Sequence, residues 1–168
     1  MSELKRLHTV TLDKDKCIGC ASCIKRCPTE AIRIRNGKAC VIYDKCIACG
    51  ECVRICPSNA KIPSYDKFDI VNNYKYKVAL IAPSFYGQFD DIKDINYILT
   101  AFRNIGFDFV YEVGIGAELV SQVTQRLFAD DKLKKPIIST ACPAVLELVS
   151  QRFENLLGNL LPLLAPVD

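Results

Sequence analysis

The chain has 168 residues, half of them hydrophobic, a formal net charge of +3 and ten cysteines. That length suffices for about one domain or a small pair, and no stretch approaches the roughly 18 consecutive apolar residues of a membrane span. Residues 1–6 carry no apolar run, so no export signal is indicated. We therefore expect a protein of the reducing cytoplasm, with neither a membrane nor a nucleic acid as its partner.

Residues 9–13 are expected to form a short strand that leads into a duplicated motif. The spacing Cys-x-x-Cys-x-x-Cys-x-x-x-Cys-Pro occurs at 17–28 and again at 46–57. It is the spacing of bacterial dicluster ferredoxins, in which three cysteines bind one 4Fe–4S cluster and the fourth binds the other. One tight loop cannot reach all four irons of a cubane. The sequence therefore predicts two 4Fe–4S clusters, one on Cys17, Cys20, Cys23 and Cys56 and one on Cys46, Cys49, Cys52 and Cys27.

Two other uses of these cysteines fit the spacing poorly. A zinc site of two Cys-x-x-Cys pairs needs four ligands and would leave the other four cysteines of the motif without a role. A disulfide framework requires an oxidising compartment, which the start of the chain does not indicate.

The duplicated motif lies in a small α+β module that we expect to span residues 1–61. Each cluster loop should be followed by a short helix that carries its fourth cysteine and stops near the proline. Residues 31–35 and 39–43 alternate around Asn36-Gly37, which predicts a β-hairpin. So short a segment cannot build a large core, so we expect the metal clusters to hold it together.

Other side chains of this module are given simpler roles. Cys40 lies outside the ligand spacing and is expected to be buried as a small hydrophobe. His8, the only histidine, is expected at the surface. Residues 1–61 contain 12 Lys and Arg against 6 Asp and Glu, an excess that an acidic electron carrier could recognise, although an ordinary solvated surface has the same composition.

Residues 62–77 are interpreted as a connector with a short docking helix, and the pattern changes at residue 78. From there, apolar runs of strand length alternate with helical apolar faces up to residue 168. This alternation predicts a partial α/β domain, with βαβαβα order, a parallel sheet and helices on both faces. Strands are expected at 78–82, 107–113 and 137–140, and apolar helix faces at 92–102, 119–127 and 145–149.

Cys142 is a candidate ligand outside the duplicated motif. It follows the third expected strand and precedes Pro143 at an expected helix start, where open α/β sheets bind ligands and a helix N-terminus favours a thiolate. Burial as a packing residue is the alternative.

The segment Thr140-Ala141-Cys142-Pro143 resembles the first active-site motif of iron-only hydrogenases, Thr-Ser-Cys-Cys-Pro. Residues 81–84, 104–107 and 153–160 are similar to further landmarks of that family, which also places a dicluster ferredoxin module in front. The resemblance implies that Cys142 binds the cubane half of a hydrogenase-type active-site cluster. It also implies that Ala141 replaces the family's proton-relay cysteine.

The later cysteine motifs of that family do not occur up to Asp168, so the resemblance implies the front half of such a protein. We expect electron transfer between a redox protein, such as a ferredoxin-type donor or acceptor, and the hydrogen-activating centre of the missing C-terminal half. No catalytic residue is expected here, and this stretch alone should not turn over hydrogen. The alternative is a hydrogenase-like sensor or iron–sulfur assembly factor.

Overall fold

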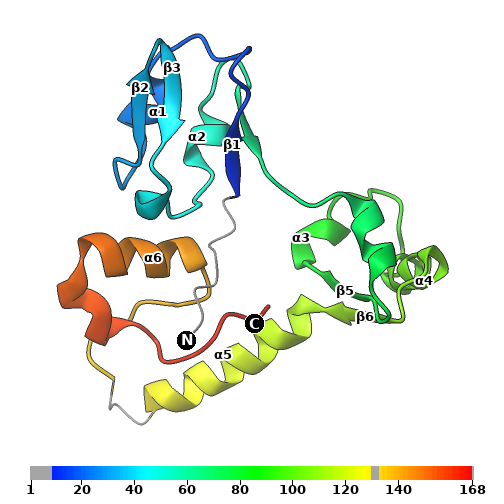
Figure 1. The fold of residues 1–168 in the computed structure, drawn as a ribbon. Coiled ribbons are helices and arrows are strands. Elements are labelled where there is room, and N and C mark those ends of the chain that lie inside the picture. Colours follow the sequence, from blue (N-terminus) through cyan, green and yellow to red (C-terminus); the bar gives the residue numbers. More distant parts are fainter. Residues whose placement is uncertain (1–8, 130–132, 168) are drawn as a thin grey trace. The chain divides into compact units, whose positions relative to one another are not determined.

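A computed structural model describes residues 9–129 and 133–167, so His8 lies outside the described residues. The chain divides into two compact units (Figure 1). The first comprises the described residues up to Asp66 together with Pro143–Gly158, and the second comprises Lys67–Cys142 and the residues from Asn159 onward.

Two antiparallel strand pairs frame the first unit. β1 (Val10–Leu12) pairs with β4 (Lys61–Pro63), and β2 (Ile32–Arg35) pairs with β3 (Lys38–Val41). The turn of the β2–β3 hairpin has φ 50° at Asn36 and 72° at Gly37, as a two-residue turn with two left-handed positions requires. The expected first strand and hairpin are confirmed, whereas β4 was not expected.

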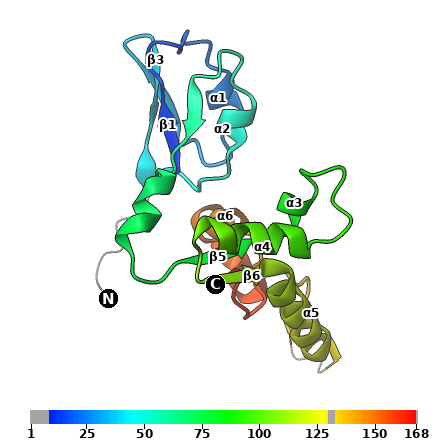
Figure 2. The same cartoon turned by 90° about the vertical axis from the view of Figure 1, so that its right-hand side faces the viewer.

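Each cluster loop leads into a helix of four residues. These helices are α1 (Ser22–Lys25) and α2 (Glu51–Arg54); they contact each other and lie beside β1 and β3 in Figure 2. A 3-10 turn at Tyr43–Lys45 precedes the second loop.

The prediction that each helix carries its fourth cysteine is wrong. α1 and α2 hold the third cysteine of each loop, and Cys27 and Cys56 lie two positions beyond the helix ends. The reason is a second turn at each of these cysteines, in which the carbonyls of Cys27 and Cys56 accept hydrogen bonds from the Glu30 and Asn59 amides, at 3.3 and 3.2 Å.

The core of the first unit contains ligand candidates among its packed side chains. Ile32, Ala39 and Ala60 are buried together with Cys17 and Cys23. No large side chain among the described residues is fully buried, so this core is small.

The expected burial of Cys40 is wrong, since its side chain is exposed. Side chains alternate along a strand, and Ala39 takes the inward position of β3.

The second unit contains a parallel βαβ arrangement. β5 (Val78–Ile81) pairs in parallel with β6 (Phe109–Glu112), and α3 (Pro83–Tyr86) and α4 (Asn96–Ile105) connect them. Gly106, at φ 109°, ends α4 as expected. α5 (Val113–Ala129) follows β6 directly, and a 3-10 helix at Phe68–Asn73 occupies the expected connector.

The full βαβαβα sheet is not confirmed. Residues 137–140 contribute a single parallel bridge, between Ile138 and Leu160, rather than a third strand beside β6. Their polar groups bond the end of the chain instead, where Ile138 donates to the Asn159 carbonyl at 2.8 Å and accepts from Leu161 at 2.9 Å.

Helices on both faces of the sheet are not confirmed either. Ala79 and Ile81 are buried, but Val78 and Leu80 on the opposite face of β5 are 52% and 51% exposed.

Two helical segments remain near the end of the chain. α6 (Pro143–Arg152) begins at the proline, as predicted, and a 3-10 helix spans Glu154–Asn159. Among the described helices, none combines the length and apolar character needed to cross a membrane.

Candidate metal centres

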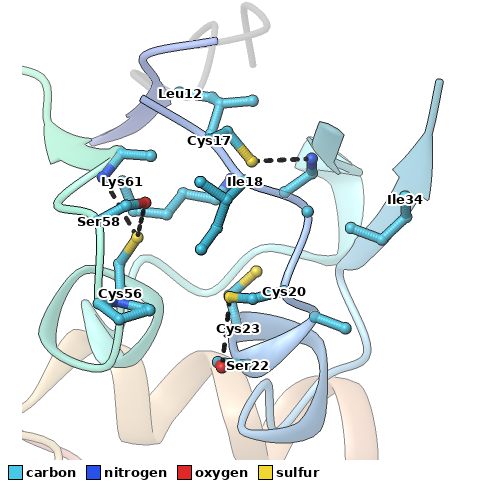
Figure 3. A pocket seen from close by; sticks show the side chains of 15 residues that line it. Leu12, Cys17, Ile18, Cys20, Ser22, Cys23, Ile34, Cys56, Ser58 and Lys61 are labelled. Carbon is cyan, nitrogen blue, oxygen red and sulfur yellow. Dashed lines mark hydrogen bonds between the residues drawn. The ribbon is translucent and has the colours of Figure 1, made fainter. Parts of the chain in front are cut away.

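Three cysteines of the first loop and one of the second surround one cavity of the first unit. The wall of this cavity includes residues from both copies of the motif (Figure 3). Its cysteines are Cys17, Cys20, Cys23 and Cys56.

The other four cysteines of the motif surround a second cavity. They are Cys27, Cys46, Cys49 and Cys52. The structure thus gathers the same two sets of four that the spacing predicts, each with one member from the other loop. Binding of metal by these thiols stays a prediction.

Left-handed backbone positions shape both loops in the same way. In the first loop Gly19 and Ala21 have φ of 69° and 62°, and in the second loop Ala48 and Gly50 have φ of 54° and 74°. Glycine and alanine have therefore exchanged places between two loops of equal conformation. Gly19 is further constrained because a Cβ there would overlap the carbonyl oxygen of Gly37.

Backbone amides donate hydrogen bonds to the sulfur of the fourth cysteine of each motif, which lines the cavity of the other loop. Ala31 N–H donates to Cys27 Sγ and Ala60 N–H donates to Cys56 Sγ, both at 3.2 Å. The Ala39 amide also reaches Cys17 Sγ at 3.5 Å, in the first set only. Donors aimed at sulfur favour the thiolate form that a metal ligand requires.

Burial and hydrogen bonds shift the pKa values of individual thiols in opposite directions. Burial is the main cause that raises the pKa of Cys23, and it raises the pKa of Cys52 to about 11. The hydrogen bond with Ser22 lowers the pKa of Cys20. Burial alone would raise the pKa of Cys56, but hydrogen bonds from the backbone and from Ser58 outweigh it, so that pKa is lowered. Metal binding must therefore displace protons from Cys23 and Cys52, whose pKa is raised.

Lys61 also lines the first cavity, although the cysteine spacing gives no sign of it. Its side chain is only 2% exposed, and its Nζ has no hydrogen-bond partner among the described residues. A buried ammonium without a counter-charge is costly. The net negative charge of a thiolate-bound iron–sulfur cluster, about −2 for an oxidised cubane, would compensate it.

The donor set fits a group larger than one metal ion. In residues 9–129 and 133–167 no three histidine, cysteine or carboxylate side chains converge closely enough to hold a single ion. The cysteines instead stand around cavities, and soft thiolates with a neighbouring cation suit an anionic iron–sulfur cluster. The residues present therefore fit 4Fe–4S clusters.

Cys142 lies outside both sets, and its side chain is exposed. It is placed by an extended segment in which Thr140 Oγ1 donates to the carbonyl oxygens of Leu161 and Leu163, at 3.1 and 2.6 Å. Its expected position at the end of a third strand is not confirmed, because that strand is reduced to the Ile138 bridge.

Comparison with known families agrees with this geometry. Residues 9–57 match the 4Fe-4S dicluster domain family. Residues 75–168, more than half of the chain, match the family described as iron only hydrogenase large subunit, C-terminal domain. The chain belongs to the iron-only hydrogenase large subunit family. Its dicluster module and hydrogenase domain support a role in iron–sulfur electron transfer.

Three curated proteins are similar to all or part of this chain. Iron hydrogenase 1 of Clostridium pasteurianum is 28% identical over 93% of this chain. Ferredoxin-2 of Desulfomicrobium norvegicum is 50% identical over 19% of the chain, and a ferredoxin of Pyrobaculum islandicum is 39% identical over 26%. The chain spans 32%, 54% and 41% of the lengths of these relatives, in that order.

Proposed function

We propose that this chain carries two 4Fe–4S clusters and relays single electrons between an external redox protein and a hydrogenase-type centre. The observation that carries the proposal is the pair of cavities, each surrounded by four cysteines in a crossed arrangement. When bound, each cluster accepts and releases one electron at a time.

The protein's own residues supply the binding site and its electrostatics. Cys17, Cys20, Cys23 and Cys56 would hold the first cluster, and Cys27, Cys46, Cys49 and Cys52 would hold the second. The amide donors to the sulfurs of Cys17, Cys27 and Cys56 lie at 3.2–3.5 Å and stabilise negative charge on the ligands.

Anaerobic reconstitution of the full chain with iron and sulfide tests the cluster count. We expect about eight iron atoms per chain and a reducible cubane signal by electron paramagnetic resonance. About four irons, or none, would contradict the proposal.

Serine substitutions test the crossed ligand sets. Cys20→Ser and Cys56→Ser should disturb the same centre and leave the same residual spectrum, although their positions belong to different loops. Cys49→Ser and Cys27→Ser should disturb the other centre, and these two variants should share the other residual spectrum. Cys40→Ser is the matched control: because Cys40 is exposed and lies outside both cavities, iron content should not change. If Cys56→Ser pairs with Cys49→Ser instead, the sets are not crossed.

Ala141 favours a second candidate function. Alanine carries no exchangeable proton, and it stands where the resembling motif has a proton-relay cysteine. A hydrogenase-like sensor or iron–sulfur assembly factor would not need rapid hydrogen turnover. Transfer of iron and sulfide from the loaded chain to an apo-acceptor would support this candidate. Hydrogen evolution after maturation with the di-iron cofactor would support catalysis instead.

A further inference from the structure

The two cluster cavities differ at one position of the internal repeat. Aligning Cys27-Pro28-Thr29-Glu30-Ala31 with Cys56-Pro57-Ser58-Asn59-Ala60 places Ile32 opposite Lys61. Both side chains are 2% exposed, and each lines the cavity beside it, Ile32 the second and Lys61 the first. An apolar residue in one copy is therefore replaced by a cation in the other.

The fold fixes Lys61 at this buried position. It is the first residue of β4, opposite Leu12 of β1. The preceding residue, Ala60, is 1% exposed and holds the sulfur of Cys56 through its amide at 3.2 Å. Figure 3 shows Lys61 among the side chains that line the first cavity, with Cys17, Cys20, Cys23 and Cys56.

No side chain among the described residues neutralises this ammonium group, because Lys61 Nζ has no hydrogen-bond partner there. The counter-charge must therefore come from what the thiols bind.

We propose that Lys61 gives the two centres different reduction potentials. Its positive charge would stabilise the reduced state of the cluster held by Cys17, Cys20, Cys23 and Cys56. This inference rests on the proposed function, since it requires loaded clusters. Lys61 acts through its charge and is not a ligand of the cluster.

The electron balance gives the direction of the effect. A low-potential redox protein donates one electron, and the first cluster with its thiolates changes from a net charge of about −2 to about −3, with no bond formed or broken. A fixed positive charge beside it favours the more negative state. The first centre is therefore reduced before the second, which has isoleucine at the equivalent position.

Potentiometric titration of the reconstituted full chain, followed by electron paramagnetic resonance, measures this effect. The test variant is Lys61→Ile, which copies the residue of the other repeat. Lys61→Arg keeps the charge. Lys14→Ile removes the same charge from an exposed side chain and is the matched control.

For Lys61→Ile we expect the equilibrium constant for reduction of one centre to fall at least tenfold, a shift of 59 mV to more negative potential for one electron. Lys61→Arg and Lys14→Ile should stay within about threefold of the unmodified chain, because charge is kept beside the cavity in one and removed at the solvent-exposed surface in the other. Combination with single-centre forms assigns the effect. It should be large in the Cys27→Ser background, which keeps the first centre, and small in the Cys56→Ser background.

Equal shifts for Lys61→Ile and Lys14→Ile, or no shift in either, would overturn the inference while leaving the cluster count intact. Loss of clusters in Lys61→Ile but not in Lys61→Arg supports the need for the charge. Loss of clusters in both variants would mean that the shape of the Lys61 side chain is what matters, and would overturn the inference. Failure of the unmodified chain to bind about eight irons would instead reject the proposed function.

Discussion

The two compact units achieve order in different ways. In the first, cysteines and alanines pack with Ile32 in a small core, and cysteine-lined cavities lie beside it. In the second, aromatic rings pack edge to face in a continuous run, with centroids 5.3–6.0 Å apart. The rings are Phe68, Phe107, Phe102, Phe85 and Phe89.

The two units therefore differ in the interactions that stabilise them. The aromatic packing of the second unit involves no metal-ligand candidate. The core of the first unit is packed around thiols that line the two cavities, so the free energy of metal binding contributes to its folding. Its stability should therefore depend on iron, and that of the second unit should not.

Removal of iron is the largest test of the contrast. After anaerobic treatment with a chelator, we expect the amides of β1–β4 and of the β2–β3 hairpin to lose protection in hydrogen exchange. The amides of β5, β6 and α4 should keep theirs, because their contacts are apolar. Peptide-resolved mass spectrometry measures both regions in one sample, and the reconstituted chain is the control. Equal loss of protection in both units would contradict the contrast.

Gly19→Ala should strongly destabilise the first unit. A left-handed φ costs roughly 1–2 kcal/mol for alanine, and overlap with the Gly37 carbonyl adds about 1–3 kcal/mol. We therefore expect a loss of about 2–5 kcal/mol in the first unit. Gly50→Ala is the control, since a Cβ there meets nothing within 4 Å and only the φ cost applies. Denaturant unfolding of the loaded chain measures both, and similar losses would remove the role assigned to the Gly37 contact.

Phe102→Ala should destabilise the second unit by about 2 kcal/mol, less than a fully buried phenylalanine, because its ring is only half-buried. Phe102 contacts both Phe85 and Phe107. Phe89, which contacts Phe85 only and is 41% exposed, gives the matched control Phe89→Ala with a smaller loss. Iron content should not change in either variant, and hydrogen exchange of β5 and β6 reports the stability. A loss of iron in Phe102→Ala would contradict the separation.

Local patterns made part of the fold and of the site predictable. Cysteine spacing is a chemical constraint of the cluster, so it identified both sets that the cavities gather. Asn36-Gly37 specified the hairpin because few other pairs accept two left-handed positions. The expected strands at β5 and β6 were found because short apolar runs with helical connections favour parallel pairing.

Long-range pairing was not predictable in the same way. β4 contains the charged Lys61 and ends at Pro63, which local propensity reads as a loop. Cys40 was misassigned because one step of strand register exchanges inward and outward faces. The segment 137–140 has strand composition but pairs with Leu160. Comparison of the repeats could have identified Lys61, since its partner Ile32 is apolar.

Tyr86 and Glu112 offer the smallest test, within the second unit. Tyr86 OH donates to Glu112 Oε2 at 3.0 Å. Burial, followed by this hydrogen bond and the charge of Glu112, raises the pKa of Tyr86 to about 12. The hydrogen bond contributes about 0.5–1.5 kcal/mol, so Tyr86→Phe should lower the stability of the second unit only slightly at neutral pH. Leu99→Met, a volume-conserving change on α4, is the control for the effect of making a substitution in this unit.

The pH dependence of this pair has a definite sign. An unfolded tyrosine ionises near about pH 10, so above that pH the folded state retains a proton that the unfolded state releases. The contribution of Tyr86 is therefore complete below about pH 10 and is lost as the pH rises toward about 12. Absorbance titration of tyrosinate should show that Tyr86→Phe removes the last tyrosine to ionise, and that Glu112→Gln shifts this ionisation to lower pH. An unchanged final step in Tyr86→Phe would show that the Glu112 contact does not hold this proton.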